Sequence, residues 1–230
     1  MPFPTVFELD LSHGMCVGVR IPEGLDTLEP REIAELVPAE IRHAENLRRL
    51  RRVTWVAGRV AMRRAIELAT GSAPERAILP DDRGAPILLP GLAGSISHKR
   101  TLAVAMVSDA AAGTLGVDIE ERRPRVRDIA RRVLTPEEMS RVESLAGDQR
   151  AVAVLLRFSL KEAVYKAIDP YFRRFIGFRE VAVFPDDSGE AAVELRVTSE
   201  RDLRIEARWA IHGDYFLTSA RAIDEGSGPG

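Results

Sequence analysis

The order of apolar patterns along these 230 residues predicts an α+β protein built as a pseudo-dimer of two similar halves. Strand-like and helical segments succeed one another as strands, helices and strands before about residue 112, and helices and strands follow again after it. The apolar content of 45% is also sufficient for a substantial core, in one large domain or two small ones. We therefore assign residues 1–112 to an N-terminal half, 113–224 to a C-terminal half and 225–230 to a flexible tail. No sequence repeat accompanies this pattern, so the prediction depends on element order alone.

Within the N-terminal half, two strand-like segments are followed by helices over about 30–70 and by a buried strand. The strands are expected at 5–9, 15–21 and 101–107. Pro38 suits the first position of a helix, and Gly71 marks the end of the second, longer one.

The C-terminal half begins with a strand at 114–119. Thr135, Pro136 and Glu138 then form a helix start, with threonine as the cap and glutamate completing a capping box. A long helix is expected over 148–168. The remaining strands are expected at 179–184, 191–197, 203–211 and 215–221.

Composition excludes several classes of protein. The formal net charge of −2 gives no signature of nucleic-acid or membrane binding. Cys16 is the single cysteine, so no internal disulfide forms, and no cluster has the spacing of zinc ligands. Without a leader-like or membrane-spanning segment, the chain is expected to be a cytoplasmic protein.

Two short segments place carboxylates and lysines in stretches that otherwise look buried. Asp118 and Glu120 are two residues apart on an expected strand, so both side chains leave one face. Glu162 and Lys166 are neighbours on the long helix, and Lys161 precedes them. Either pair alone favours solvated surface charges. Together, three carboxylates beside lysines favour Mg²⁺-dependent chemistry on a phosphate ester.

A second group of candidate residues is basic. Seven arginines and no acid lie between Arg48 and Arg64. Arg48, Arg52, Arg59 and Arg63 fall within about 60° of one another around a helix, which indicates either a solvated basic face or an anion-binding site.

The third candidate is the segment from Gly94 to His98, which contains Ser97. Its small residues permit close backbone approach to phosphate oxygens. Because adjacent strand residues point to opposite faces, Ser97 and His98 do not form a nucleophile–base pair.

At this point the sequence resembles the 4′-phosphopantetheinyl transferases, over roughly residues 45–185. It is most similar to the monomeric type of the enterobactin and mycobacterial branch, which activates siderophore, nonribosomal-peptide and polyketide synthases. The strongest matching motifs are Gly116-Val117-Asp118-Ile119-Glu120 and Lys161-Glu162-Ala163-Val164-Tyr165-Lys166. Weaker matches are Arg51-Arg52, Gly58-Arg59, Arg83-Gly84-Ala85-Pro86, Gly94 to His98 and Phe175 to Phe178.

The resemblance implies transfer of phosphopantetheine from coenzyme A to a serine of an apo acyl or peptidyl carrier protein, with release of adenosine 3′,5′-bisphosphate. It implies the family's fold, with the active site in the cleft between the halves, and a monomer that uses Mg²⁺, or Mn²⁺ as an alternative. The implied metal ligands are Asp118, Glu120 and Glu162. The implied catalytic residues are Glu162, as base for the serine, with Lys161 and Lys166. The implied coenzyme A ligands are Arg51, Arg59, Arg83, Ser97, His98 and Lys161.

The sequence departs from the family at one position. Family members with Gly-Lys-Pro contact coenzyme A through the lysine, whereas this chain has Ala85 there, and we assign the contact to Arg83 instead. Two rival functions remain at this point, a non-enzymatic phosphate- or nucleic-acid-binding module and a Mg²⁺-dependent phosphohydrolase.

Overall fold

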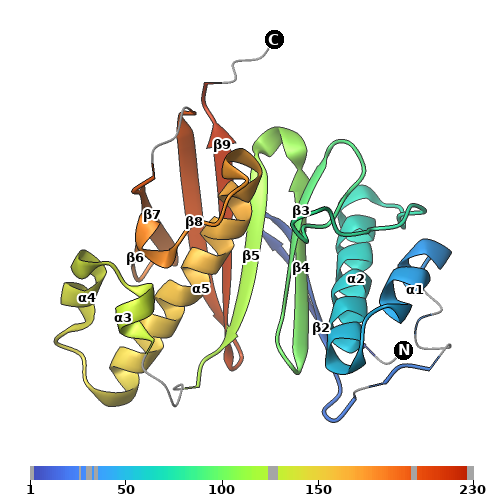
Figure 1. Ribbon diagram of the computed structural model, residues 1–230, viewed down its shortest axis with the longest axis horizontal. Coiled ribbons are helices and arrows are strands. Elements are labelled where there is room, and N and C mark those ends of the chain that lie inside the picture. The colour runs from blue at the N-terminus through green and yellow to red at the C-terminus, as the bar shows by residue number, and fades with distance from the viewer. Residues whose placement is uncertain are drawn as a thin grey trace. The chain divides into compact units, whose positions relative to one another are not determined.

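A computed structural model describes residues 3–25, 27–29, 33, 36–123, 129–197 and 201–226. The chain divides into two compact units, Met1–Leu115 and Gly116–Gly230. In each unit a long helix packs on an antiparallel sheet, which is the α+β architecture expected (Figure 1).

The first unit contains a four-stranded sheet in the order β1-β2-β4-β3. Its elements are β1 (Thr5–Leu11), β2 (Gly14–Arg20), α1 (Pro38–Glu45), α2 (Arg49–Thr70), β3 (Leu92–His98), β4 (Leu102–Asp109) and the short η2 (Ala110–Ala112). The apolar face of α2 packs on β2 and β4. Pro38 begins α1 and Gly71 ends α2 in the left-handed conformation, both as predicted.

The second unit contains a five-stranded sheet in the order β5-β9-β8-β7-β6. Its strands are β5 (Thr114–Glu121), β6 (Val181–Pro185), β7 (Glu190–Leu195), β8 (Leu203–His212) and β9 (Tyr215–Asp224). Its helices are α3 (Ala130–Val133), α4 (Pro136–Val142), α5 (Gly147–Phe172) and η3 (Phe178–Glu180). The central helix α5 packs on β9, β8 and β6.

The start of α4 follows the predicted capping box. Thr135 Oγ1 accepts a hydrogen bond from the Glu138 amide, and Glu138 Oε2 accepts one from the Thr135 amide at 2.7 Å. The sequence did not indicate α3, because its four residues are too few to show a period.

The predicted tail is partly ordered. Glu225 donates its amide to the Asp202 carbonyl at 2.8 Å, and Gly226 donates to Asp224. The rest of the tail, residues 227–230, lies outside the described residues.

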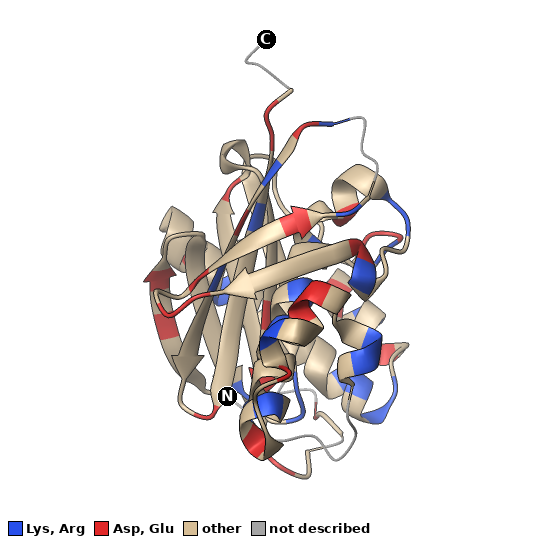
Figure 2. Ribbon diagram, turned by 90° about the vertical axis from the view of Figure 1, so that its left-hand side faces the viewer, with Lys and Arg blue, Asp and Glu red and all other residues tan. Residues whose placement is uncertain are grey.

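Charges of both signs are interspersed in the part of the molecule that Figure 2 presents, as the near-zero net charge suggests. Cys16 on β2 is fully buried, and burial raises the pKa of its thiol to about 12. Within the described ranges, no helix combines the length and apolarity needed to cross a membrane.

Candidate active site

The position of α5 on β5 is set by Gly116. A Cβ atom at this residue would lie 1.9 Å from the carbonyl oxygen of Ala163 and 2.8 Å from the amide nitrogen of Ala167. Both atoms belong to helix backbone, which has little room to move, so only glycine permits this approach. Asp118 and Glu120 are two and four residues further along β5, and they therefore share the face of Gly116 that meets α5.

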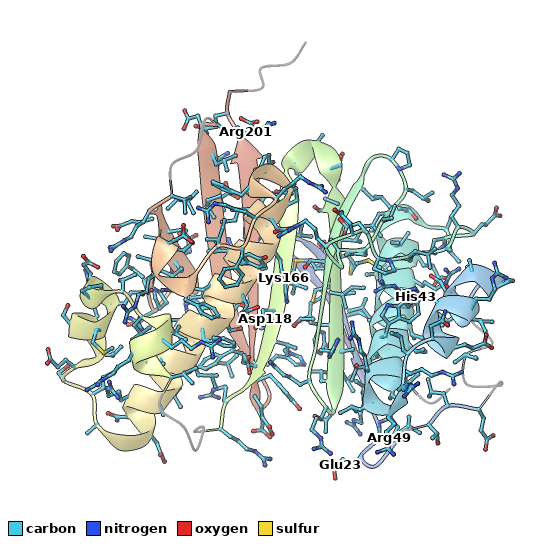
Figure 3. All side chains as sticks on the ribbon, viewed as in Figure 1. Glu23, His43, Arg49, Asp118, Lys166 and Arg201 are labelled. Atoms are coloured by element: carbon cyan, nitrogen blue, oxygen red, sulfur yellow. The ribbon has the colours of Figure 1, made fainter. Side chains whose placement is uncertain are left out.

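Asp118 is held by α5 from both of its carboxylate oxygens. Lys166 Nζ donates to Oδ1 at 3.1 Å and to the Val117 carbonyl at 2.8 Å, and Ser159 Oγ donates to Oδ2 at 2.9 Å. Figure 3 shows the Asp118 and Lys166 side chains together between the strand and the helix. Asp118 is 4% exposed, whereas the Lys166 side chain is 27% exposed. The Lys166 side chain is therefore partly exposed beside a buried carboxylate.

The other two candidate carboxylates lie on the same two elements as this pair. Glu162 is half-buried on α5, one helical turn before Lys166, and Glu120 is buried on β5. Carboxylate oxygens are the hard donors that Mg²⁺ prefers, so the chemistry of the three side chains fits such an ion. Across the described part of the chain, however, no three His, Cys, Asp or Glu side chains are gathered as a preformed metal site. Lys166 holds Asp118 Oδ1 in this arrangement.

Lys161, expected near the phosphates, is bound to acceptors of the protein itself. Its side chain is 1% exposed, and its Nζ donates to Glu138 Oε2 at 2.6 Å and to the carbonyls of Val133 and Phe178 at 2.8 Å each. All three hydrogens of the ammonium group are thus used inside the unit. Burial lowers the pKa of Lys161, and Glu138 opposes that shift. Lys161 thus connects α3, α4 and η3 to α5.

Two of the four stacked arginines also have structural partners. Arg59 is 4% exposed, donates Nε to the Ile78 carbonyl at 2.6 Å and lies over the Trp55 ring. Its burial lowers the pKa of Arg59 to about 10. Arg63 pairs with Glu40, a fully buried carboxylate on α1, at 3.2 Å. One anion beside these arginines is thus the Glu40 carboxylate, which pairs with Arg63, while Arg59 donates to a carbonyl of the protein.

The remaining basic candidates of the first unit are at its surface. Gly58 of α2 faces Ile96 of β3, and Gly94 faces Met62. The two contacts show that β3 and α2 run in opposite directions, since two residues forward along β3 correspond to four residues back along α2. These steps are of similar length, about 6.6 Å in a strand and about 6 Å in a helix. Continuing from Ile96 to His98 therefore reaches the level of the first turns of α2. Exposed Arg51 is in those turns, and His98 is exposed as well.

Arg83 and Ser97 differ in their surroundings. Arg83 is exposed in a turn in which Asp81 Oδ1 accepts the amides of Arg83 and Ala85 at 2.8 and 2.9 Å. Ser97 is 7% exposed on β3, next to exposed His98, so the two residues face opposite sides of the strand as expected.

Three residues that shape this site were missed at the sequence level, namely Ser159, Thr218 and Glu138. Ser159 and Thr218 are hydroxyl residues in largely apolar elements, and no rule of spacing connects them to Asp118. Glu138 was recognised as a helix cap, but the cap motif does not indicate that the carboxylate also pairs with a lysine 23 residues away.

Comparison with known proteins defines the class of protein to which this fold and site belong. Residues 114–220 match the model of the 4′-phosphopantetheinyl transferase superfamily, and residues 39–108 match that of the 4′-phosphopantetheinyl transferase N-terminal domain. The chain is 31% identical over 201 residues to the 4′-phosphopantetheinyl transferase Svp of Streptomyces mobaraensis, covering 83% of this chain and 80% of that protein.

Two further relatives agree. The 4′-phosphopantetheinyl transferase Npt of Nocardia iowensis is 28% identical over 217 residues, covering 86% of this chain and 96% of Npt. A holo-[acyl-carrier-protein] synthase of Lactobacillus johnsonii is 32% identical over 80 residues, covering 34% of this chain and 67% of the synthase. The chain is a transferase, and it belongs to the 4′-phosphopantetheinyl transferase superfamily.

Proposed function

We propose that this enzyme transfers the 4′-phosphopantetheine group of coenzyme A to a serine of an apo acyl or peptidyl carrier protein and releases adenosine 3′,5′-bisphosphate. The observation that carries the proposal is the buried Asp118 carboxylate beside the partly exposed Lys166 ammonium, in a chain of this family. Such a pair places opposite charges where a phosphate ester and a divalent cation would meet, and charge stabilisation dominates phosphoryl-type transfer.

Lys166 is the residue best placed to neutralise the reacting phosphate. Its side chain is flexible and partly exposed, and its present acceptors are one carboxylate oxygen and one carbonyl. An ammonium in this position can donate to a phosphate oxygen and to the departing phosphate group. Glu162 lies one turn away and is assigned as the base that accepts the serine proton, directly or through water.

Asp118, Glu120 and Glu162 are the residues that would hold Mg²⁺ or Mn²⁺. A divalent cation bound there would supply further neutralisation of the phosphate oxygens. Asp118 would then present Oδ1, the oxygen that Lys166 now holds, and keep Oδ2 on Ser159.

Recognition of coenzyme A is assigned to Arg51, Arg83 and His98, which are exposed, with Ser97 on the same strand as His98. Coenzyme A brings several phosphate charges, and guanidinium groups bind phosphate by paired hydrogen bonds. Arg59 and Lys161 are left out of this set because both are buried on protein acceptors.

The carrier is proposed to belong to a nonribosomal-peptide, polyketide or siderophore synthase, acting with a monomeric transferase in the cytoplasm. Support comes from the resemblance of the two-half sequence to transferases of that type, and from the two family models matched within one chain.

Intact-mass spectrometry of apo carriers tests the proposal. Each carrier of a panel of acyl and peptidyl types is incubated with the enzyme, coenzyme A and Mg²⁺ or Mn²⁺, and with a chelator as control. A carrier that gains one phosphopantetheine only with metal supports transfer. Unchanged carriers across the panel would refute it, and coenzyme A cleaved without carrier modification would instead identify a phosphohydrolase.

A further inference from the structure

A buried chain of hydroxyl groups contacts Asp118 at Oδ2, the carboxylate oxygen that Lys166 does not use. Ser159 of α5 and Thr218 of β9 are both fully buried, and their hydroxyl oxygens are 2.9 Å apart. Ser159 Oγ is also 2.9 Å from Asp118 Oδ2. Side chains of β9, α5 and β5 are thus connected in a chain that ends at the Asp118 carboxylate. The proposed reaction uses neither of the two hydroxyls.

Counting hydrogens gives this chain a direction. Each hydroxyl has one hydrogen to donate, and an ionised carboxylate only accepts. The hydrogen of Ser159 is therefore used on Asp118. The Thr218 hydroxyl can then donate to Ser159 Oγ or to the Ser159 carbonyl at 3.0 Å. Between the two hydroxyls, donation can therefore run only from Thr218 to Ser159, and the carboxylate of Asp118 is the final acceptor.

Both hydroxyls are fully buried, and hydrogen bonds connect them to each other and to the carboxylate of Asp118. Buried hydroxyls without partners are destabilising, and valine and alanine would pack at the same sites with no such risk. Hydrogen-bonded networks of this kind restrict a side chain to one rotamer. Here the restricted side chain is Asp118, whose Oδ1 is left facing Lys166.

We infer that Ser159 and Thr218 are positioning residues, which fix Asp118 so that Oδ1 is presented to the cation and phosphate of the reaction. The inference rests on the proposed function in one respect, the assignment of Asp118 to metal binding. Loss of an outer hydrogen-bond partner of a metal ligand typically costs 10–100-fold in metal affinity or activity.

Two substitutions at Thr218 separate positioning from packing. Thr218→Val keeps the volume and removes the hydroxyl, whereas Thr218→Ser keeps the hydroxyl and removes a methyl group. We expect Thr218→Val to lower kcat and to weaken Mn²⁺ binding by about tenfold or more. Thr218→Ser should lower the melting temperature but restore kcat and Mn²⁺ affinity to near wild-type values. Ser159→Ala should behave like Thr218→Val, and it provides the comparison if the valine variant does not fold.

Mn²⁺ binding is measured directly, from the electron paramagnetic resonance signal of free Mn²⁺, without coenzyme A or carrier. Ser140→Ala, which removes an exposed hydroxyl of α4 bonded to the Glu137 carbonyl, is the matched control and should change neither quantity. Wild-type kcat and Mn²⁺ affinity in Thr218→Val and Ser159→Ala would overturn the inference. The inference would also be overturned if Thr218→Ser lost as much kcat and Mn²⁺ affinity as Thr218→Val. Failure of the proposed function is a separate result, because the wild-type enzyme would then modify no carrier.

Discussion

Replacing Lys161 by methionine tests whether this lysine of the Lys-Glu-Ala motif supports the fold or takes part in the reaction. Methionine has a similar length and no charge, so Lys161→Met leaves the Glu138 carboxylate buried without its cation. Breaking a buried ion pair in this way typically costs about 3–5 kcal/mol. Glu138 keeps the amides of Thr135 and Val183 as donors, which favours the lower part of that range.

A chain of this length loses about 2–4 °C in melting temperature per kcal/mol, so Lys161→Met should melt roughly 6–20 °C earlier. Adding Glu138→Gln removes the unpaired charge and should recover part of the loss. The carbonyls of Val133 and Phe178 still lack their donor, so recovery is incomplete. A coupling free energy of about 1–3 kcal/mol between the two positions is expected from thermal and urea denaturation of the four proteins.

Turnover is the decisive measurement. At a temperature well below the melting transition, Lys161→Met should keep kcat within about threefold of wild type, since the three hydrogens of Nζ are used on protein acceptors. Lys166→Met on the same helix is the comparison: its pair with Asp118 is partly exposed, so we expect a smaller loss in melting temperature than for Lys161→Met, and a large loss of kcat. A Lys161→Met variant of native stability that loses kcat tenfold or more would refute the reasoning.

Three further predictions concern the proposed reaction. Glu162→Gln should lose on the order of 10²-fold or more in kcat, because the amide neither accepts the serine proton nor binds a cation well; near-native kcat would show that the base lies elsewhere. Arg83→Ala should raise the KM for coenzyme A without a change in melting, whereas Arg59→Ala should lower the melting temperature, since it removes a buried contact to Ile78; the opposite ranking would return Arg59 to the coenzyme A site. Arg173→Glu should raise the KM for an acidic carrier and leave that for coenzyme A unchanged, because Arg173 is exposed two residues before Phe175, which is 77% exposed; an unchanged carrier KM would make this segment a connector.

Local patterns predicted most elements, because apolar periods and caps are local properties. The C-terminal end of helix α5 is an exception, because local rules place it too early. The sequence indicates an end near residue 168, since Pro170 lacks an amide hydrogen. The helix instead continues to Phe172, and Arg173 closes it in the left-handed conformation. Tyr171 and Phe172 pack on the core of the second unit, and this burial offsets the single hydrogen bond that proline forfeits.

Partners of buried charges could not be predicted in the same way. Arg63 pairs with Glu40 and Lys161 pairs with Glu138, and each pair spans 23 residues and two helices. Neither separation corresponds to a helical or strand period, so the pairing follows only from tertiary packing. This is why a run of arginines without an intervening acid looked like an anion site, although one of its counterions is a carboxylate of α1.

The separate roles of Lys161 and Lys166 follow from helix geometry. At 100° per residue, five residues place the two lysines about 140° apart around α5, so they cannot face the same group. Glu162 lies about 40° from Lys166 and about 100° from Lys161, which puts the carboxylate with Lys166. Lys166 contacts Asp118 on β5, and Lys161 points to α3, α4 and η3. Two lysines of one motif thus have different neighbours, and the glutamate between them belongs with only one.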